Sequence, residues 1–368
     1  SADISQLTIN ANRSDINAAF KANWNTARVN LSGIINSNFL NPNDLYQAVA
    51  QNNTQPKAPV AQPKGSPETK ADTDHFINKI NARIDWNLKN IELAENSGEY
   101  YGITAKTVLN NGIFTGNPIQ IKTIAGIINA ALRVQGLADS TPKTQLTFAG
   151  ENIDLDKIKT LRSYLSGSTA NLNGNITTRG IDTQTALSHL TGNIEVEITQ
   201  GKVVNQEFND LPHEIGLTEK NKSVSYSKTD SESVLNCAAF NLKMNNGLIN
   251  LNKNVAVETS VLDVVLSGII NLPAQTLSLS LEPSLPNGAY NRLINAAQLI
   301  KIEGSFSNPK MRLDTQKIIS KGIEKGVEKG LNKLLDKAGL TGENTNANTK
   351  DNGATTNTIT AKRPLSLC

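Results

Sequence analysis

Histidines are the first side chains in this sequence whose chemistry would require a defined spacing. His75, His189 and His213 are the three histidines, and none has a second histidine or a cysteine at metal-site spacing. His189 lies within an expected short helix next to Leu190, so a surface or packing role fits it better than a ligand role. We therefore expect no metal site.

Paired carboxylates are the second group that could do chemistry. Asp154 with Asp156, and Glu195 with Glu197, have a two-residue spacing. On a strand this spacing places the glutamates on one solvated face, which explains them without acid–base catalysis. The serine nucleophile elbow, the glycine-rich phosphate loop and the dinucleotide fingerprint are absent from the sequence. We expect that the protein is not an enzyme and needs no cofactor.

The composition suits a sheet that buries one face better than it suits a large compact core. Hydrophobic residues make up 38% of the 368 residues and aromatic residues only 4%. The formal charge of +3 is too small for a dedicated basic surface, so we expect no nucleic-acid partner. Cys237 and Cys368 are the only cysteines, which predicts neither a disulfide framework nor a cysteine metal site.

Strict alternation of apolar and polar residues predicts half-buried strands along most of the chain. In GNIEVEITQ, Ile194, Val196 and Ile198 point one way and the glutamates point the other. The same alternation returns in AAFNLKM and TLSLSLEP. The inward side chains expected there are Phe240, Leu242, Met244, Leu277, Leu279 and Leu281.

Turns and short helices are expected between these strands. Asn111-Gly112 and Asn246-Gly247 predict tight hairpin turns. TIAGIINAALRV, from Thr123, predicts a short helix, and the strand that begins at Thr144 is expected to lead into a helix of about ten residues. DTQTALSHL predicts another short helix, with Asp182 as its N-cap.

The segment KGIEKGVEKGLNKLL, from Lys321, combines helical spacing with a glycine on every turn. At about 100° per residue, Ile323, Val327 and Leu331 share one side of an amphipathic helix. The lysines of the opposite side are Lys317, Lys321, Lys325, Lys329, Lys333 and Lys337. The segment has no run of about 18 apolar residues and therefore cannot span a bilayer. Docking on its own domain, contact with a membrane surface and self-pairing through the glycines are the roles left open, and the lysines with Ile323, Val327 and Leu331 are the membrane-contact candidates.

Composition divides the chain into five parts. They are a β-rich segment over 1–50, a flexible Pro/Lys/Gln-rich insertion over 51–71, a β-rich domain over 72–314, the amphipathic helix over 315–339 and a disordered tail over 340–368. The chain starts at Ser1 without a signal peptide or a transmembrane segment. We expect that the natural start of the protein is missing, so that the β-rich segment continues from an earlier part of the chain and any membrane anchor lies upstream.

The order of Gly180, Asp182, Leu187, Leu190 and Gly192, followed by an alternating strand that ends in Gly201-Lys202-Val203, resembles the C-terminal domain of the AsmA family of bacterial envelope proteins. LSGIINLPAQTLSLSLEP and IEGSFSNPKMRLD are similar to later strands of that family, the second through Gly304, Asn308 and Pro309. The resemblance covers residues 144–314 and is weaker over 1–135.

The resemblance implies a mainly β fold with short helices, in which a long curled antiparallel sheet forms a groove. It implies the periplasmic part of an inner-membrane-anchored protein that binds or transfers phospholipids and supports outer-membrane biogenesis. The inward side chains from Ile194 to Leu281 named above are then lipid-groove candidates, and the alternative is that each packs in an ordinary core. Other function hypotheses are an adaptor that contacts other envelope proteins during outer-membrane protein assembly, without lipid, and a surface-exposed adhesin.

Overall fold

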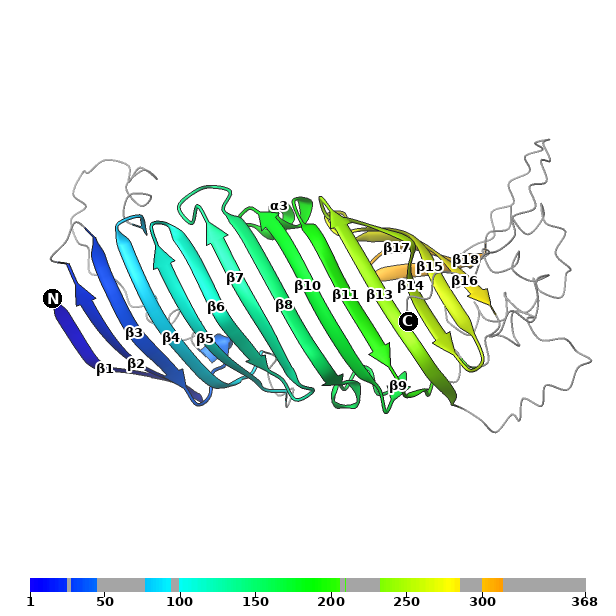
Figure 1. The fold of residues 1–368 in the computed structure, drawn as a ribbon, viewed down its shortest axis with the longest axis horizontal. Helices are drawn as coiled ribbons and strands as arrows, with labels where there is room; N and C mark the ends of the chain where they lie inside the picture. The colour runs from blue at the N-terminus through cyan, green and yellow to red at the C-terminus, as the bar shows by residue number, and fades with distance from the viewer. Residues whose placement is uncertain are drawn as a thin grey trace, which may run out of the picture. The chain divides into compact units, whose positions relative to one another are not determined.

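The computed structural model describes residues 1–24, 28–44, 77–93, 99–205, 209, 232–284 and 300–313. The chain forms two compact units. The first comprises Ser1–Ile158 and Ala170–Ile194, and the second comprises Lys159–Thr169 and the described residues from Glu195 onward. Both units consist mainly of β-strands, with few and short helices (Figure 1). The predicted mainly β fold is confirmed.

In the first unit the strands are neighbours in sequence order. They are β1 (Ala2–Ala11), β2 (Ser14–Asn23), β3 (Val29–Ser37), β4 (Ile80–Ile91), β5 (Tyr101–Asn110), β6 (Ile113–Lys122), β7 (Ile127–Gln135) and β8 (Lys143–Asp154). From β1 to β8 each neighbouring pair is antiparallel except β3 and β4, which are parallel. β8 also pairs with β10 (Thr169–Arg179). The sheet of this unit is therefore a nearly continuous antiparallel meander.

The second unit continues the same style of pairing. Its strands are β9 (Leu165–Ser166), β12 (Lys202–Val203), β13 (Ser233–Asn245), β14 (Leu248–Thr259), β15 (Asp263–Asn271), β16 (Thr276–Ser284), β17 (Ile300–Ser305) and β18 (Asn308–Leu313). β11 (Thr191–Thr199) is divided between the two units. From β13 to β18 the strands are antiparallel neighbours in sequence order, and β17 lies behind β14 in Figure 1.

Register shifts explain how the sheet curls. Register shifts interrupt the pairing of β13 with β14 between Phe240 and Met244, and of β14 with β15 between Asn252 and Val255. The first unit has similar shifts, for example between Gly116 and Ile119 on β6. A bulge bends its strand and increases the local twist, so repeated bulges curve the sheet. The curled, predominantly antiparallel sheet is thus confirmed.

Two short elements were predicted as helices and are not. Residues of TIAGIINAALRV form β7, which pairs with β6 and β8 on both sides, and Ile127, Ile128 and Val134 are β-branched residues that favour strands. After β8 the chain makes only the 3-10 turn η1 (Leu155–Lys157), not a helix of about ten residues. It must then turn back, because β9 pairs with β12.

The local signals for turns and for one helix are confirmed. Asn111-Gly112 and Asn246-Gly247 have positive φ at both residues, as a tight hairpin turn requires. The helix α3 (Thr183–Ser188) has Asp182 as its N-cap, whose carboxylate accepts a hydrogen bond of 2.8 Å from the Thr185 backbone N–H. This hydrogen bond is the main reason why the pKa of Asp182 is lowered.

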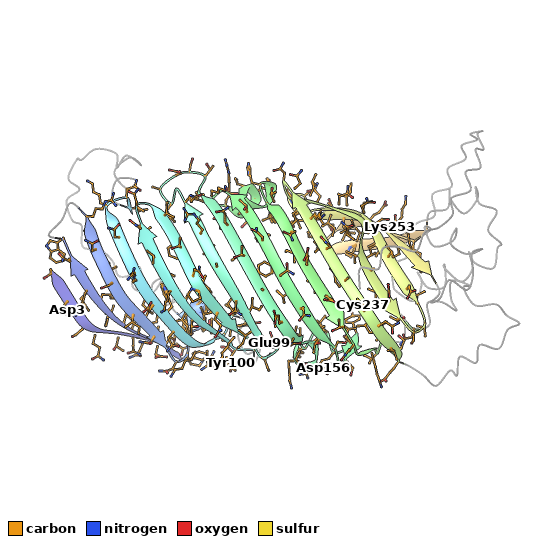
Figure 2. All side chains as sticks on the ribbon, in the orientation of Figure 1. Asp3, Glu99, Tyr100, Asp156, Cys237 and Lys253 are labelled. Atoms are coloured by element: carbon orange, nitrogen blue, oxygen red, sulfur yellow. The ribbon has the colours of Figure 1, made fainter. Side chains whose placement is uncertain are left out.

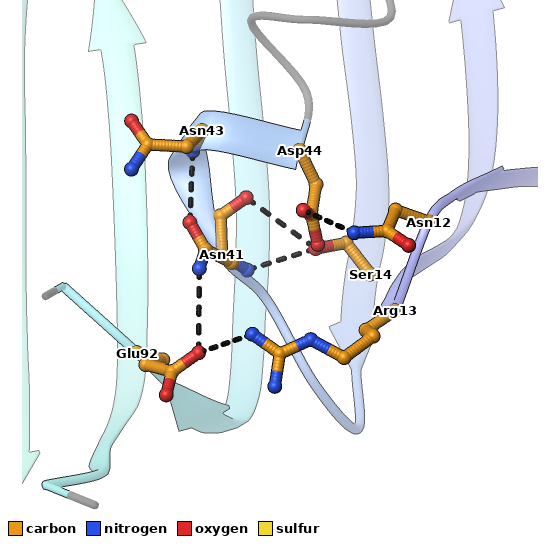
Figure 3. Close-up of polar contacts among 7 residues, drawn as sticks. All are labelled: Asn12, Arg13, Ser14, Asn41, Asn43, Asp44 and Glu92. Atoms are coloured by element: carbon orange, nitrogen blue, oxygen red, sulfur yellow. Dashed lines mark hydrogen bonds and ion pairs between the residues drawn. The ribbon is translucent and has the colours of Figure 1, made fainter. Parts of the chain in front are cut away.

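A polar cluster fixes the chain where it leaves β3 for the parallel β4 (Figure 3). Ser14 Oγ donates to Asp44 (2.7 Å) and accepts from the Asn41 backbone N–H (2.8 Å). Glu92, whose side chain is 1% exposed, accepts from Arg13 at 2.6 Å and from Asn41 Nδ2 at 3.3 Å. Every carboxylate of this cluster is engaged within it, so its role is to hold the β1–β2 turn against the start of the crossover.

Cys237 departs from the expectation drawn from the cysteine count. It lies on β13 with 5% of its surface exposed, and it is disulfide-bonded. A disulfide is therefore present on β13, although the cysteine count predicted no disulfide framework.

Candidate functional site: an apolar sheet face

One face of the sheet in the first unit is apolar along cross-strand rows that the register defines. One row runs through Phe20, Gly33, Ile84, Thr107 and Gly116, and continues on the same face to Leu132 and Leu146. We call this surface the apolar face. Its large side chains include Phe20, Leu31, Ile35, Ile84, Trp86, Leu88, Ile103, Leu109, Phe114, Ile119, Ile121, Ile128, Leu132, Val134, Leu146 and Phe148.

The opposite face of the same strands is polar. Arg83, Asp85, Asn87 and Lys89 alternate with the apolar residues of β4, and all four are exposed. Lys106 on β5 stands directly opposite Asp85. The two faces thus differ sharply in polarity, as period-two alternation requires.

Described residues do not bury the apolar face. Each of its large side chains from Phe20 to Phe148 keeps an intermediate exposure, and on β1 the exposed fractions reach 49% for Ile4, 41% for Leu7 and 43% for Ile9. The buried apolar side chains of this unit, in the part that the structure describes, are small or lie at strand ends: Ala11, Ala18, Ile91, Ala125, Ile153, Leu155 and Ala170. The large side chains cover one another laterally and remain accessible from above.

Polar atoms on the apolar face are satisfied within it. The Trp86 indole N–H donates to Thr107 Oγ1 at 2.9 Å, and the Thr107 hydroxyl donates to the Ile84 carbonyl at 3.2 Å. A ligand lying there need not supply hydrogen bonds, which suits hydrocarbon rather than a polar molecule.

Aromatic rings lie flat on this face where the neighbouring strand has a glycine. The Phe20 ring occupies the space that a Cβ at Gly33 would need, and the Phe148 ring does the same at Gly174. Larger residues at these glycines would push the rings away from the sheet. The two phenylalanine–glycine pairs therefore keep the surface of the apolar face flat.

The second unit carries a similar apolar side that is more deeply buried. Leu251 is 2% exposed and Val255 3%, and Leu266, Leu281 and Ile300 follow in register on β15, β16 and β17. A small cluster of Val203, Leu235 and Ala238 packs with Leu165, Ile198, Phe240 and Val257. This unit resembles an ordinary core more closely than the first unit does.

The predicted lipid-groove residues are distributed unevenly between these settings. Leu277, Leu279 and Leu281 share the apolar side of β16 and are partly exposed, as are Ile194, Val196 and Leu242. Ile198 and Phe240 pack against the buried cluster, and Met244 is 4% exposed. Their placement does not test lipid binding, which stays a prediction.

The membrane-contact candidates, Ile323, Val327, Leu331 and the six lysines from Lys317 to Lys337, lie outside the described residues, as do the 51–71 insertion and the 340–368 tail. The expectations for these segments stay predictions. Within the described residues, no helix is long and apolar enough to cross a membrane.

Candidate groups for chemistry do not converge in the described part of the chain. No group of three or more histidine, cysteine, aspartate or glutamate side chains there could hold a metal ion. His189 ends α3 with a ring nitrogen 2.9 Å from the Thr185 carbonyl. Asp154 caps η1 through the Asp156 backbone N–H at 3.0 Å. These contacts are local and structural.

The residues of the apolar face were missed as candidates when only the sequence was considered. They lie on β2 to β8, while the predicted residues lie on β11, β13 and β16. The signal was present in the alternation of INARIDWNL and ITAKTVL, where Ile84, Trp86 and Ile103 occupy one face. Alternation reports which side chains share a face but not whether another layer covers it, so it could not rank the strands.

A comparison with curated proteins gives one relative for this fold. AsmA family protein YhjG of Escherichia coli (strain K12) is 22% identical over 223 residues, which cover 60% of this chain and 31% of YhjG. This distant similarity supports the resemblance to the AsmA family. It spans about a third of the length of YhjG. No protein-family model matches the chain, and no solved structure matches it.

The AsmA-like residues have clear structural roles in the first unit. Asp182 caps α3, and Gly192 has positive φ and lies so close to the backbone of Asn175 and Ile176 on β10 that a Cβ would not fit. The motif thus encodes the connection from β10 through α3 into β11.

Proposed function

We propose that this AsmA-family chain is a non-enzymatic binder of phospholipid acyl chains, and that the chains lie on the apolar face of the first unit. The observation that carries the proposal is the partial exposure of every large apolar side chain on that face from Phe20 to Phe148. Contiguous apolar surface of this extent on a protein marks an interaction or ligand site.

Hydrocarbon is the ligand class that suits such a surface. Burying each methylene contributes about 0.8 kcal/mol without any directional contact, so chains could slide along the face. The strands of this unit have nine to twelve residues, about 30 to 40 Å of sheet, whereas one leaflet of a bilayer has a hydrocarbon depth of about 15 Å. The strands are therefore longer than an extended acyl chain of one leaflet.

The cellular setting that we propose is supported by the AsmA resemblance. The AsmA resemblance supports an envelope protein, and we infer that this chain is the periplasmic part of an inner-membrane-anchored protein. There it would carry or shelter phospholipid between the inner and outer membranes and so support outer-membrane biogenesis. Phospholipid, a membrane surface and other envelope proteins are the partners that this function implies.

A second candidate function rests on the second unit. Its β13 and β14 bury Leu235 (1% exposed), Leu251 (2%) and Val255 (3%) like an ordinary core. A structural or adaptor role in outer-membrane protein assembly, without lipid, would need only such a packed scaffold. The two functions differ in whether the first unit binds lipid.

Lipid extraction from paired variants tests the proposal. The chain is purified without detergent, incubated with phospholipid vesicles, separated from them and extracted for mass spectrometry. We expect bound phospholipid in the wild type and in Ile34→Glu, because Ile34 is 43% exposed on the polar face. Ile84→Glu, on the apolar face, should lose most of it. Lipid absent from the wild type, or retained equally by both variants, would favour the adaptor function.

A further inference from the structure

The two ends of the strands in the first unit differ in charge. One end, at the upper edge in Figure 1, carries α3 and the turns that join β5 to β6 and β7 to β8. The register places Asn23 opposite Asn30 at this end, and Gly180 N–H donates to the Pro142 carbonyl at 3.2 Å. Five basic residues lie along this edge, which we call the basic rim: Lys21, Arg28, Lys79, Lys143 and Arg179.

The three acidic side chains on the basic rim offset only part of the charge of its five basic residues. Asp3 stands opposite Lys21, with 3.8 Å between Oδ2 and Nζ, and the Asp182 carboxylate is engaged in capping α3. Asp139 lies in the turn before β8. Arg83 and Arg133 add positive charge on the polar face, close to this end of β4 and β7.

At the opposite ends of the strands, acidic residues outnumber basic ones. Figure 2 labels Glu99 and Asp156 along this lower edge. The acidic residues there are Asp15, Asp44, Glu92, Glu99, Glu151, Asp154 and Asp156, and the basic residues are Arg13, Lys89, Lys122 and Lys157. We call this edge the acidic rim. The apolar face lies between two rims of opposite net charge.

We propose that the basic rim holds the phosphate groups of the lipids whose acyl chains lie on the apolar face. The inference rests on the proposed function and adds an orientation: headgroups at the basic rim, chains running along the strands toward the acidic rim. A phosphate attracts lysine and arginine, and the same charge is repelled by the acidic rim. Anionic lipids should therefore bind more tightly than zwitterionic lipids with the same chains.

A tryptophan that already lies on the apolar face can report acyl-chain binding by its fluorescence. The chain has two tryptophans, Trp86 on the apolar face and Trp24 just after β2. With Trp24→Phe as the parent, phospholipids with brominated acyl chains quench Trp86 when a chain lies on the face. Titrations with brominated phosphatidylglycerol and brominated phosphatidylcholine then give affinities for an anionic and a zwitterionic headgroup.

Two double variants change the net charge of the protein by the same amount and differ only in which rim carries the substitutions. Lys79→Glu with Arg179→Glu alters the basic rim, and Lys122→Glu with Lys157→Glu alters the acidic rim; all four side chains are exposed. We expect the first pair to weaken phosphatidylglycerol binding about tenfold, the effect of two exposed charge contacts together with new repulsion. The second pair should change it less than twofold. The difference should shrink in high salt. Circular dichroism establishes that both variants fold.

The outcomes separate this inference from the function on which it rests. Equal weakening by both double variants, or no weakening by either, would overturn the basic rim as the headgroup site while Trp86 quenching persists. No quenching of Trp86 in the parent would overturn the proposed function itself. Broadening of the phosphorus NMR signal of inorganic phosphate that depends on Lys79 and Arg179 would assign the rim to free anions instead of lipid.

Discussion

Replacing one leucine in each unit by glutamate distinguishes an accessible apolar face from a packed core. Leu132 on β7 is partly exposed, and Leu251 on β14 is 2% exposed. The two sites are otherwise matched, because each leucine stands opposite a glycine, Gly116 or Gly268, on the neighbouring strand.

The expected costs differ because only one of the new carboxylates can reach water. Full burial of a leucine contributes about 1.5 to 3 kcal/mol. Because Leu132 is only partly buried, Leu132→Glu should lower the free energy of unfolding by about 1 kcal/mol. At Leu251 the full burial term is lost and a charge enters a buried site without a partner, which costs at least several kcal/mol. That is a large fraction of the roughly 5 to 15 kcal/mol that stabilises a typical domain.

Hydrogen exchange measured by mass spectrometry reads the two units separately. Leu132→Glu should leave the amides of β6 to β8 protected, and Leu251→Glu should remove protection across β13 to β15. Loss of protection in β6 to β8 as severe as that in β13 to β15 would refute the conclusion that the face of the first unit is accessible.

Three further predictions concern single groups. Arg13→Ala should lower the free energy of unfolding by about 1 to 3 kcal/mol, because it leaves the buried Glu92 without its 2.6 Å partner, whereas Lys21→Ala should cost under about 0.5 kcal/mol; equal urea midpoints would contradict this. Burial, and then the charge of Glu258, raises the pKa of Asp263 above its ordinary 3.8. Stability from this group therefore falls as pH rises through its raised pKa, and Asp263→Asn should raise the Tm more at pH 7 than at pH 3, a gain that a pH-independent Tm difference would rule out. Cys237 should resist alkylation in denaturant until a reductant is added, and immediate labelling would exclude the disulfide.

Alternation and turn dipeptides carry most of the information about this fold. ITAKTVL followed by Asn111-Gly112 already defines β5, its turn and the side chains that share a face. Asp182 likewise marks the start of α3 through its capping side chain. These signals are local, so a single sequence is enough to find them.

The features that the sequence predicted wrongly or did not predict depend on contacts between distant parts of the chain. The Ile127–Gln135 segment has apolar residues at spacings that a short helix also allows, and pairing with β6 and β8 decides in favour of a strand. The polar cluster around Glu92 joins residues as far apart as Arg13 and Glu92, and no local pattern indicates it. The degree of cover over Leu132 and Leu251 also depends on distant strands, so the sequence could not tell the accessible face from the buried one.

Fluorescence quenching of a single tryptophan on either face of β4 tests the central claim most directly. In a Trp24→Phe chain, Trp86 reports from the apolar face; with Trp86→Phe and Asn87→Trp, the tryptophan moves to the adjacent position on the polar face. Phospholipids brominated on the acyl chain should quench Trp86 strongly and the relocated tryptophan weakly. Equal quenching at both positions, or none at Trp86, would contradict the conclusion that acyl chains lie on the apolar face.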